Sequence, residues 1–187
     1  MIATIYLTGA FHEDGFADSC DGFGGGWEKS QVLTIMKDSR VGTYGIVGLL
    51  LIIGLKFLVL LELQQVSTEL MLFGLLCGHS LSRLMPSLIM QRYGYVSDLG
   101  TSKSQSVTSV KLSHSEMLLS AVPVVILLVW VWSFNFLLAV GVTLLVTLSL
   151  GQYFQRRIGG YTGDCLGAVQ QVCEVVFYLF ILAEITP

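Results

Sequence analysis

Charged residues are scarce in this chain. Asp, Glu, Lys and Arg together make up 12% of its 187 residues, whereas ordinary soluble domains carry about 25%. Hydrophobic residues make up 53%, and the mean hydropathy is +0.74. Acids outnumber bases, so the formal net charge is −3, which does not favour nucleic acid as a partner. The composition predicts an integral membrane protein.

Cysteine pairs, sequence repeats and a signal peptide are also missing. The four cysteines form no C-x-x-C pair, so no metal–sulfur spacing and no disulfide framework is visible. There is no repeat of about 20–50 residues and no heptad array. Residues 1–10 are apolar but lack the charged region and cleavage site of a signal peptide. They are too short to cross a bilayer, so we expect the end of a transmembrane helix in a chain truncated at its N-terminus.

Long apolar runs predict the membrane spans. One crossing needs about 20 residues. The run at 117–150 has 34 residues and would extend about 51 Å as one helix, against a hydrocarbon core of about 30 Å. We therefore expect two helices there, with a break in the aromatic and polar cluster at 130–135. The prediction is an all-α polytopic membrane protein with about five to six transmembrane helices, forming a single membrane-embedded domain over 1–187. The runs occupy 43–61, 70–90, 117–150 and 166–186.

A charge inside such a run is costly and usually faces the protein interior. The runs contain four charged residues: Lys56, Arg83, Glu174 and Glu184. Lys56 either extends its amine towards the membrane surface or pairs with a buried acid. Glu174 could form such a pair with Lys56 or with Arg83. Arg83 could instead bind a phosphate at the membrane face. The sequence leaves these alternatives open.

Almost half of the carboxylates fall in one short stretch near the start of the chain. Residues 12–40 hold six of the thirteen Asp and Glu residues and three of the ten Lys and Arg residues. Four acids, Glu13, Asp14, Asp18 and Asp21, lie within nine residues and repel one another. A hard divalent cation such as Mg²⁺ or Mn²⁺ would offset this repulsion, because it takes oxygen ligands and leaves positions open for phosphate. The alternative is a solvated acidic loop.

The spacing of the acids favours a metal site. Asp14, Asp18 and Asp21 are four and three residues apart, so in a helix they would share one face. The glycines that follow them would let the backbone approach a ligand closely. Lys37 and Arg40 lie downstream and could meet phosphate oxygens, Arg40 as a two-pronged donor. We interpret the stretch as a phosphoryl-transfer constellation rather than a hydrolytic triad.

A second polar stretch lies near 156–164, where two arginines precede a glycine pair and a Thr-Gly-Asp sequence. Because successive spans alternate in direction, the segments 11–42, 91–116 and 152–166 should fall on the same side of the membrane. They hold eight of the ten basic residues, which makes that side cytoplasmic by the positive-inside rule. We therefore expect a cytoplasmic-facing site. Its acids would be Asp14, Asp18, Asp21 and Asp164.

Several separate motifs occur in a fixed order along nearly the whole chain. They are His12-x-Asp14-Gly15-x-Ala17-Asp18-x-x-Asp21-Gly22, then Ile35-Met36-Lys37-Asp38-Ser39-Arg40-x-Gly42-Thr43, then Ser82-Arg83, then Arg156-Arg157-x-Gly159-Gly160-Tyr161-Thr162-Gly163-Asp164-x-Leu166-Gly167-Ala168. On these residues the sequence resembles cobalamin synthase, the adenosylcobinamide-GDP ribazoletransferase family of bacteria and archaea. That family normally begins further upstream with a first transmembrane helix. We expect this helix to be missing or partial here.

The resemblance implies a transferase of the cell's inner membrane that uses adenosylcobinamide-GDP and α-ribazole (or its 5′-phosphate). A ribose hydroxyl attacks the phosphorus on the cobinamide side, GMP leaves, and adenosylcobalamin (or its phosphate) forms. This is the last assembly step of cobalamin biosynthesis, and the family requires Mg²⁺. The lipid bilayer is a further expected partner, no nucleic acid is expected, and a homo-oligomer is left open.

Roles for individual residues follow as hypotheses. The catalytic candidates include His12 as a general base, which typically contributes about 10²–10⁴-fold, or else one of the aspartates. His12 could instead orient a neighbouring aspartate, and Asp38 could pair with Arg40 or Lys37. Metals and basic side chains would neutralise the diphosphate. The expected metal ligands are Asp14, Asp18, Asp21 and Asp164, of which Asp18 and Asp164 are also catalytic candidates. The expected substrate contacts are Lys37, Arg40, Arg83 and Thr162.

Two other functions compete with this interpretation. The acidic motif is similar to that of the CDP-alcohol phosphotransferases, but their pattern has Ala-Arg where Ala17 is followed here by Asp18. A membrane transporter would place polar residues and broken helices near the middle of the membrane. Here the carboxylates concentrate at one face, so both alternatives are less favoured.

Overall fold

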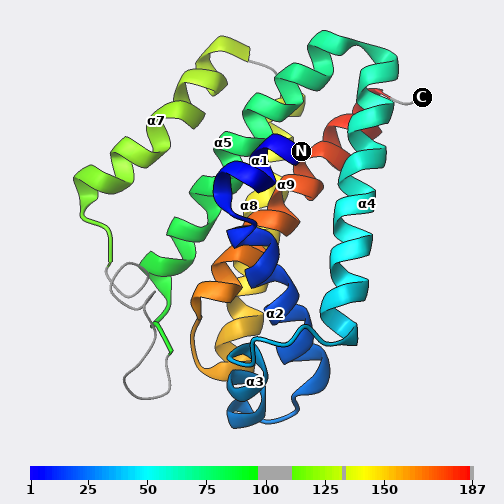
Figure 1. The fold of residues 1–187 in the computed structure, drawn as a ribbon. Helices are drawn as coiled ribbons and strands as arrows, with labels where there is room; N and C mark the ends of the chain where they lie inside the picture. Colours follow the sequence, from blue (N-terminus) through cyan, green and yellow to red (C-terminus); the bar gives the residue numbers. More distant parts are fainter. Residues whose placement is uncertain (97–110, 132–133, 186–187) are drawn as a thin grey trace.

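The computed structural model describes residues 1–96, 111–131 and 134–185, and these are helical almost throughout. They contain no β-strand, only an isolated bridge between Tyr95 and Tyr161. The prediction of an all-α fold is confirmed (Figure 1). The helices are α1 (Ile2–Thr8), α2 (Phe11–Gly25), α3 (Lys29–Met36), α4 (Thr43–Val66), α5 (Thr68–Arg92), α7 (His114–Val131), α8 (Phe134–Ile158) and α9 (Gly163–Ile185).

Among the described residues, four helices are long and apolar enough to cross a membrane. They are α4, α5, most of α8 and most of α9, and α7 contains a shorter apolar stretch at Ser115–Leu127. The predicted break in the longest apolar run is confirmed, because α7 ends at Val131 and α8 begins at Phe134. The chain is therefore a multi-pass membrane protein. With α7 counted, its apolar helices reach the lower end of the predicted number.

Helix α9 lies at the centre of the bundle. The helices α2, α4, α5 and α8 all pack against it, and 67% of its apolar window is buried, against 22% for α4. Its residues Val169, Cys173 and Phe177 have no solvent-exposed surface. The first turn of α9, which carries Asp164, is therefore held in place by packing on several sides.

The helix ends are sorted into two sets (Figure 1). The end of α2, all of α3, the start of α4 and the turn between α8 and α9 lie at one end of the bundle, and the turn between α4 and α5 lies at the other, near the C-terminus. This matches the sorting predicted from the sequence. The α3 end carries the basic residues at the start of α3, after α3 and in the last turn of α8. These are Lys29, Lys37, Arg40, Arg156 and Arg157.

Several predicted loops are shorter than expected. The segment 11–42 contains α2 and α3, the interval between the apolar runs 43–61 and 70–90 reduces to Ser67, and the segment 152–166 reduces to 159–162. Most of the loop predicted at 91–116 lies outside the described residues. The acidic and glycine-rich α2 is helical because its small residues are buried against neighbouring helices, and packing of this kind overrides the low helix propensity of glycine.

The bounds of the two short helices, α1 and α3, are determined by the residues that flank them. Helix α1 has seven residues and ends at Thr8. Gly9 and Ala10 follow it with left-handed backbones (φ 61° and 58°) and turn the chain into α2. Helix α3 follows the turn after α2. Glu28 and the side chain of Gln31 form a capping box at its start, an arrangement that satisfies otherwise unpaired amide groups.

A buried polar network joins three helices inside the bundle. The ammonium nitrogen of Lys56 on α4 lies 3.0 Å from Oε2 of Glu174 on α9, which confirms one of the two pairings predicted for these spans. Lys56 also donates to the side chain of Gln171 (2.9 Å), and Gln171 in turn donates to Glu13 on α2 (2.9 Å). All four side chains are buried. The charge of Lys56 is thus satisfied inside the protein rather than at the membrane surface.

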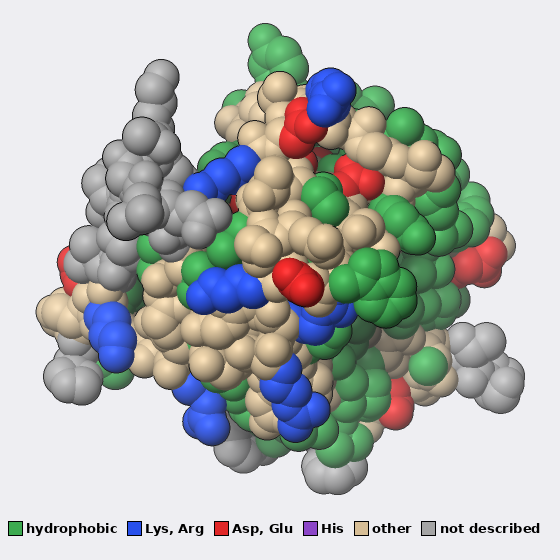
Figure 2. Space-filling model, turned by 90° about the horizontal axis from the view of Figure 1, so that it is seen from below, with side chains coloured by type: hydrophobic (Ala, Val, Ile, Leu, Met, Phe, Trp, Pro, Cys, Tyr) green, Lys and Arg blue, Asp and Glu red, His purple; other side chains and the backbone are tan. Residues whose placement is uncertain are grey.

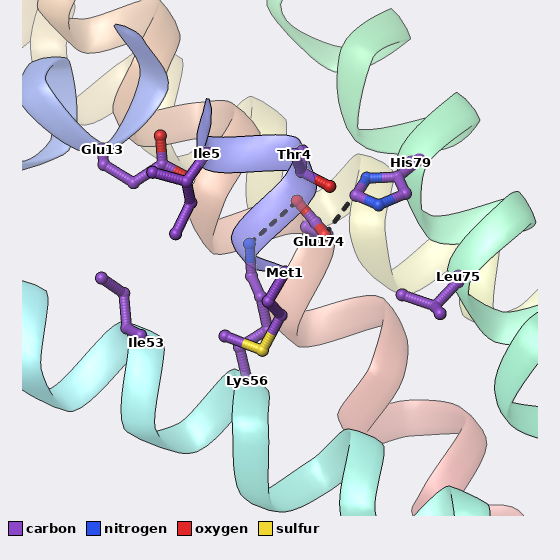
Figure 3. Close-up of a pocket in the computed structure, with 9 residues that line it drawn as sticks. All are labelled: Met1, Thr4, Ile5, Glu13, Ile53, Lys56, Leu75, His79 and Glu174. Atoms are coloured by element: carbon purple, nitrogen blue, oxygen red, sulfur yellow. Dashed lines mark ion pairs between the residues drawn. The ribbon is translucent and has the colours of Figure 1, made fainter. Parts of the chain in front are cut away.

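Glu174 is the centre of this network. Its carboxylate also accepts hydrogen bonds from Gln170 (2.7 Å) and Tyr178 (2.9 Å), and Nδ1 of His79 lies 3.3 Å away. Figure 3 shows Glu174 and Lys56 facing a small cavity beside α1. The cavity measures about 10 Å³, the space of about one water molecule.

Candidate active site

The predicted acids meet where α2 crosses α9. A Cβ atom on Gly15 of α2 would lie 3.0 Å from Cα of Asp164, and one on Gly167 of α9 would lie 3.0 Å from the carbonyl oxygen of His12. The two backbones are therefore in direct contact, and no larger side chain fits at either glycine without moving a helix. This crossing places Asp164 next to the turn of α2 that begins at Asp14.

The pKa of Asp18 shows that the aspartates interact electrostatically. Burial raises the pKa of Asp18 to about 7, and the charges of Asp164, Asp14 and Asp21 raise it in the same direction. Removal of water and nearby like charges both disfavour the charged carboxylate. The repulsion between carboxylates that was inferred from the sequence is thus present in the folded chain. It acts between Asp18 and Asp164, which are nearly 150 positions apart in the sequence.

These carboxylates suit a divalent cation in donor type and charge. All are oxygen donors, which Mg²⁺ and Mn²⁺ prefer. In the described part of the chain, no three His, Cys, Asp or Glu side chains converge closely enough to hold a metal ion. Binding would therefore require Asp14, Asp18 and Asp164 to rotate towards a common point. Asp14 is exposed and Asp18 is half-buried, so both have room to do so.

Asp21 differs from the other aspartates because its carboxylate is already engaged. Oδ2 accepts a hydrogen bond from the backbone amide of Gly42 (2.7 Å), and Oδ1 accepts one from the amide of Gly45 (2.8 Å). Asp21 therefore joins α2 to the start of α4. The sequence predicted Asp21 as a metal ligand and contained no signal for this contact beyond the glycines themselves.

Thr162 lies at the start of α9, directly before Asp164. Its hydroxyl accepts a hydrogen bond from the backbone amide of Cys165 (3.3 Å), which is the bond of an N-cap residue. The same hydroxyl lies 3.3 Å from Oδ2 of Asp164. Thr162 therefore orients the first turn of α9, whose amide groups and helix dipole favour anionic groups nearby.

Basic side chains gather at this end of the molecule. Figure 2 looks onto the α3 end and shows Lys and Arg side chains spread around Asp and Glu side chains. Lys37 is exposed at the C-cap of α3. Arg40 donates to the carboxylate of Asp38 from Nε (3.0 Å) and Nη2 (2.6 Å), so the pairing considered for Asp38 occurs. This bonding lowers the pKa of Asp38 to about 2.

Exposed pairs such as Arg40 with Asp38 contribute little stability, so Arg40 can exchange this partner for a phosphate. Arg157 is held differently. It donates to the carbonyl oxygen of Gly26 (2.6 Å) and to the hydroxyl of Tyr153 (3.0 Å), and its guanidinium lies over the ring of Phe23. Arg157 therefore fastens the end of α8 to the turn between α2 and α3.

His12 and Arg83 lie close enough to affect each other. Burial lowers the pKa of His12, and the positive charge of Arg83 lowers it further, which keeps the imidazole neutral near neutral pH. Arg83 donates from Nη1 to the carbonyl oxygen of His79 (3.1 Å) and lines a groove between α1, α5 and α7. The charges that act on Asp18 are all carboxylates. Arg83 is thus among the charges that shift the pKa of His12 and not among those that shift the pKa of Asp18.

Sequence reasoning missed the residues that assemble the site. Gly15 and Gly167 permit the crossing, and Gln171 links Glu13 to the buried ion pair. The available signals were a glycine directly after Asp14 and two adjacent glutamines, Gln170 and Gln171, inside an apolar span. Neither signal identifies a partner helix, because both describe only local sequence.

The family model described as cobalamin-5-phosphate synthase matches residues 1–182. The chain belongs to the cobalamin-5-phosphate synthase family. This match confirms the resemblance found in the sequence. No solved structure matches the chain.

Curated relatives of the family are similar along nearly the whole chain. A protein of Shewanella woodyi is 43% identical over 182 residues, which cover 97% of this chain and 70% of the relative. One of Shewanella frigidimarina is 44% identical over 183 residues (98% and 70%), and one of Leptospira interrogans is 42% identical over 185 residues (96% and 69%). All three are named adenosylcobinamide-GDP ribazoletransferase.

Proposed function

We propose that the chain is an adenosylcobinamide-GDP ribazoletransferase that carries out the last assembly step of cobalamin biosynthesis. The name borne by its relatives supports the substrates. The single structural observation that carries the proposal is the contact of α2 with α9, which places the Asp14 and Asp18 carboxylates beside Asp164. A CDP-alcohol phosphotransferase and a transporter are not favoured by these relatives.

In the proposed reaction, a ribose hydroxyl oxygen of α-ribazole or its 5′-phosphate attacks the phosphorus on the cobinamide side of the diphosphate. A new P–O bond forms to the ribose oxygen, the bridging P–O bond breaks, and GMP leaves with the bridging oxygen. The hydroxyl proton passes to a base, for which the neutral imidazole of His12 or one of the aspartates is the candidate. A base of this kind typically contributes about 10²–10⁴-fold.

We propose that Asp14, Asp18 and Asp164 hold Mg²⁺ during this reaction. When bound, Mg²⁺ would neutralise charge on the transferring and leaving phosphates. Lys37 and Arg40 lie at the same end of the molecule and would bind diphosphate oxygens, Arg40 after releasing Asp38. Thr162 and the amide groups that begin α9 would add uncharged donors.

The same arguments support an inner-membrane location with the site facing the cytoplasm. The face at the α3 end carries Lys and Arg side chains together with Asp and Glu side chains (Figure 2), and positively charged connections of membrane proteins are predominantly cytoplasmic. The adenosyl corrinoid and the nucleotide are large polar molecules, and a site at the end of the bundle is open to the aqueous side from which they would arrive.

The test uses membranes that contain this chain, supplied with adenosylcobinamide-GDP, α-ribazole and Mg²⁺. Cobalamin and GMP should appear together, and both should vanish without the metal or with the Asp18→Asn variant. Glu69→Gln is the matched control, because Glu69 lies in the first turn of α5 at the opposite end of the bundle, and it should retain activity. Equal product from the parent and from Asp18→Asn would contradict the proposed site.

A further inference from the structure

Asp21 on α2 holds the start of α4 through two hydrogen bonds. We call this unit of Asp21, Gly42 and Gly45 the clamp. Its carboxylate is 7% exposed, and its two oxygens accept hydrogen bonds from the amides of Gly42 and Gly45. Gly42 is the N-cap of α4 and Gly45 is its third residue. The first amides of a helix have no partner within the helix, and a carboxylate there also meets the positive end of the helix dipole. The N-cap residue is a glycine and has no side chain that could bond these amides. The carboxylate of Asp21 on α2 bonds them instead.

The two glycines are shaped to this carboxylate. A Cβ atom on Gly42 would lie 2.5 Å from Oδ1 of Asp21, and a Cβ on Gly45 would come closer still to Oδ2. Real Cβ atoms do not approach oxygen this closely, because dense packing leaves no room for such overlap. A side chain at either position would therefore push the carboxylate away. Asp21, Gly42 and Gly45 form one unit.

The clamp lies at one end of the segment that carries two proposed substrate contacts. Residues 37–42 connect α3 to α4, and Lys37 and Arg40 belong to them. Within this segment the amide and guanidinium of Arg40 bond to Asp38. Towards α3, the buried face of Met36 packs next to Gly22 of α2. The segment is therefore anchored to α2 at both ends, through Met36 and through Asp21.

Asp18 and Asp21 are three residues apart on α2, so they lie on neighbouring parts of one helix face. Any change in how Asp21 holds α4 moves the segment relative to Asp18. We propose that Asp21 is a positioning residue, which holds the start of α4 so that Lys37 and Arg40 stand over the metal-binding aspartates, and that it does not ligate the metal. This inference rests on the proposed function.

Two variants test the clamp by different routes. Asp21→Asn keeps the shape of the side chain but replaces one acceptor oxygen with an amide donor. Gly45→Ala leaves every acid in place and displaces the Asp21 carboxylate through the added Cβ. Gly54→Ala is the matched control in the same helix, because a Cβ there meets nothing within 4 Å.

Three measurements apply to each variant. The first is the affinity for Mn²⁺, followed by electron paramagnetic resonance in detergent. The second is the mobility of a spin label at Ser39→Cys, in a Cys20→Ser background because the other three cysteines are buried. The third is the KM for adenosylcobinamide-GDP at saturating Mg²⁺.

The clamp predicts the same pattern for Asp21→Asn and Gly45→Ala. The Mn²⁺ affinity should stay within about twofold of the parent, the label should become more mobile, and KM should rise about tenfold with a smaller change in kcat. A rise in KM with little change in kcat is the sign of lost substrate binding, as expected when Lys37 and Arg40 no longer meet the diphosphate. Gly54→Ala should match the parent in all three measurements.

Two results would overturn the proposal. One is a loss of Mn²⁺ affinity of tenfold or more in Asp21→Asn, which would make Asp21 a ligand. The other is an unchanged label in Gly45→Ala, which would show that the carboxylate does not hold the segment. Both readouts are independent of turnover, so they decide the role of Asp21 even if the chain lacks the proposed activity.

Discussion

The carboxyl group of Asp18 shows how strongly neighbours can change a single residue. Its pKa is raised to about 7 by burial and by three neighbouring carboxylates, against about 3.9 for an unperturbed Asp. Without a metal ion, Asp18 is therefore largely protonated over much of the acidic range. Mg²⁺ held by Asp18, as proposed above, would require the ionised carboxylate, so the metal and the proton would compete for this group.

This competition predicts an unusual dependence of stability on pH. In the unfolded chain Asp18 ionises near pH 4, whereas in the folded, metal-free protein it keeps its proton until about pH 7. The folded state binds more protons across this window, so the free energy of unfolding should fall as pH rises from about 4 to about 7. Asp18→Asn should lose this part of the slope.

Thermal unfolding in detergent with a chelator, measured at several pH values for the parent and for Asp18→Asn, checks this expectation. Saturating Mg²⁺ should reverse the trend in the parent, because it favours the ionised form. Identical slopes for the two proteins without metal would show that Asp18 keeps an ordinary pKa.

At the scale of helices, the contact between α2 and α9 is the feature on which the site depends. Gly15→Ala should lower activity, because the added Cβ meets the backbone of Asp164 and forces it to move by a few tenths of an ångström. The loss should be smaller than the roughly 10²-fold that a displacement of about 1 Å can cause. The loss of stability should be only about 1–3 kcal/mol, as is typical of overpacking.

Turnover and thermal unfolding of Gly15→Ala should be compared with Gly141→Ala in α8, where a Cβ meets nothing within 4 Å. The control should retain activity, and its stability should be equal to or slightly above that of the parent. Full activity in Gly15→Ala would mean that the spacing of α2 and α9 does not set the geometry of the site.

A second prediction at the scale of helices concerns the ion pair between Lys56 on α4 and Glu174 on α9. Lys56→Met leaves the carboxylate of Glu174 buried without its cation, although Gln170 and Tyr178 still donate to it. Breaking one side of a buried pair typically destabilises by about 3–5 kcal/mol. The double variant Lys56→Met with Glu174→Gln should recover much of this loss, because no net charge then remains unpaired.

Unfolding temperatures of the two single variants and the double variant measure the coupling. Additive losses would show that the pair does not stabilise the bundle.

The predictions from sequence were accurate for the long apolar helices and poorer for α2. The break between α7 and α8 was predictable because aromatic and polar residues interrupt an apolar run that is too long for one crossing. The region of α2 was predicted as part of a loop, and a helix was considered as the alternative, because acids and glycines dominate its sequence. Its helical structure comes from burial of Gly15, Ala17 and Ser19 against neighbouring helices, which no local pattern reveals.

The candidate site was predictable in composition but not in contacts. The acids could be named because charges are rare in this chain, so a cluster stands out. The clamp between Asp21 and α4 could not be predicted, because carboxylates that bind metal and carboxylates that cap a helix look alike in a sequence. The link from Glu13 through Gln171 to Lys56 joins three distant segments, and local spacing contains no information about it.

For the whole molecule, the sorting of helix ends predicts which residues face the cytoplasm. Ser39 is exposed beside the site, whereas Gln65 is exposed near the turn between α4 and α5 at the other end. Ser39→Cys, in a Cys20→Ser background, should react with a membrane-impermeant maleimide in inside-out vesicles and not in intact cells. Gln65→Cys should show the reverse, and the same sidedness for both variants would contradict the topology.

The meeting of α2 with α9 also bears on how the protein is made. Membrane helices are inserted in the order of synthesis, and Asp164 arrives on α9, long after the acids of α2 have left the ribosome. Until α9 enters the membrane, α2 lacks the neighbour against which Gly15 packs. The proposed metal site would thus form only after α9 has been synthesised, so a polypeptide released before α9 would carry the acidic motif without being able to use it.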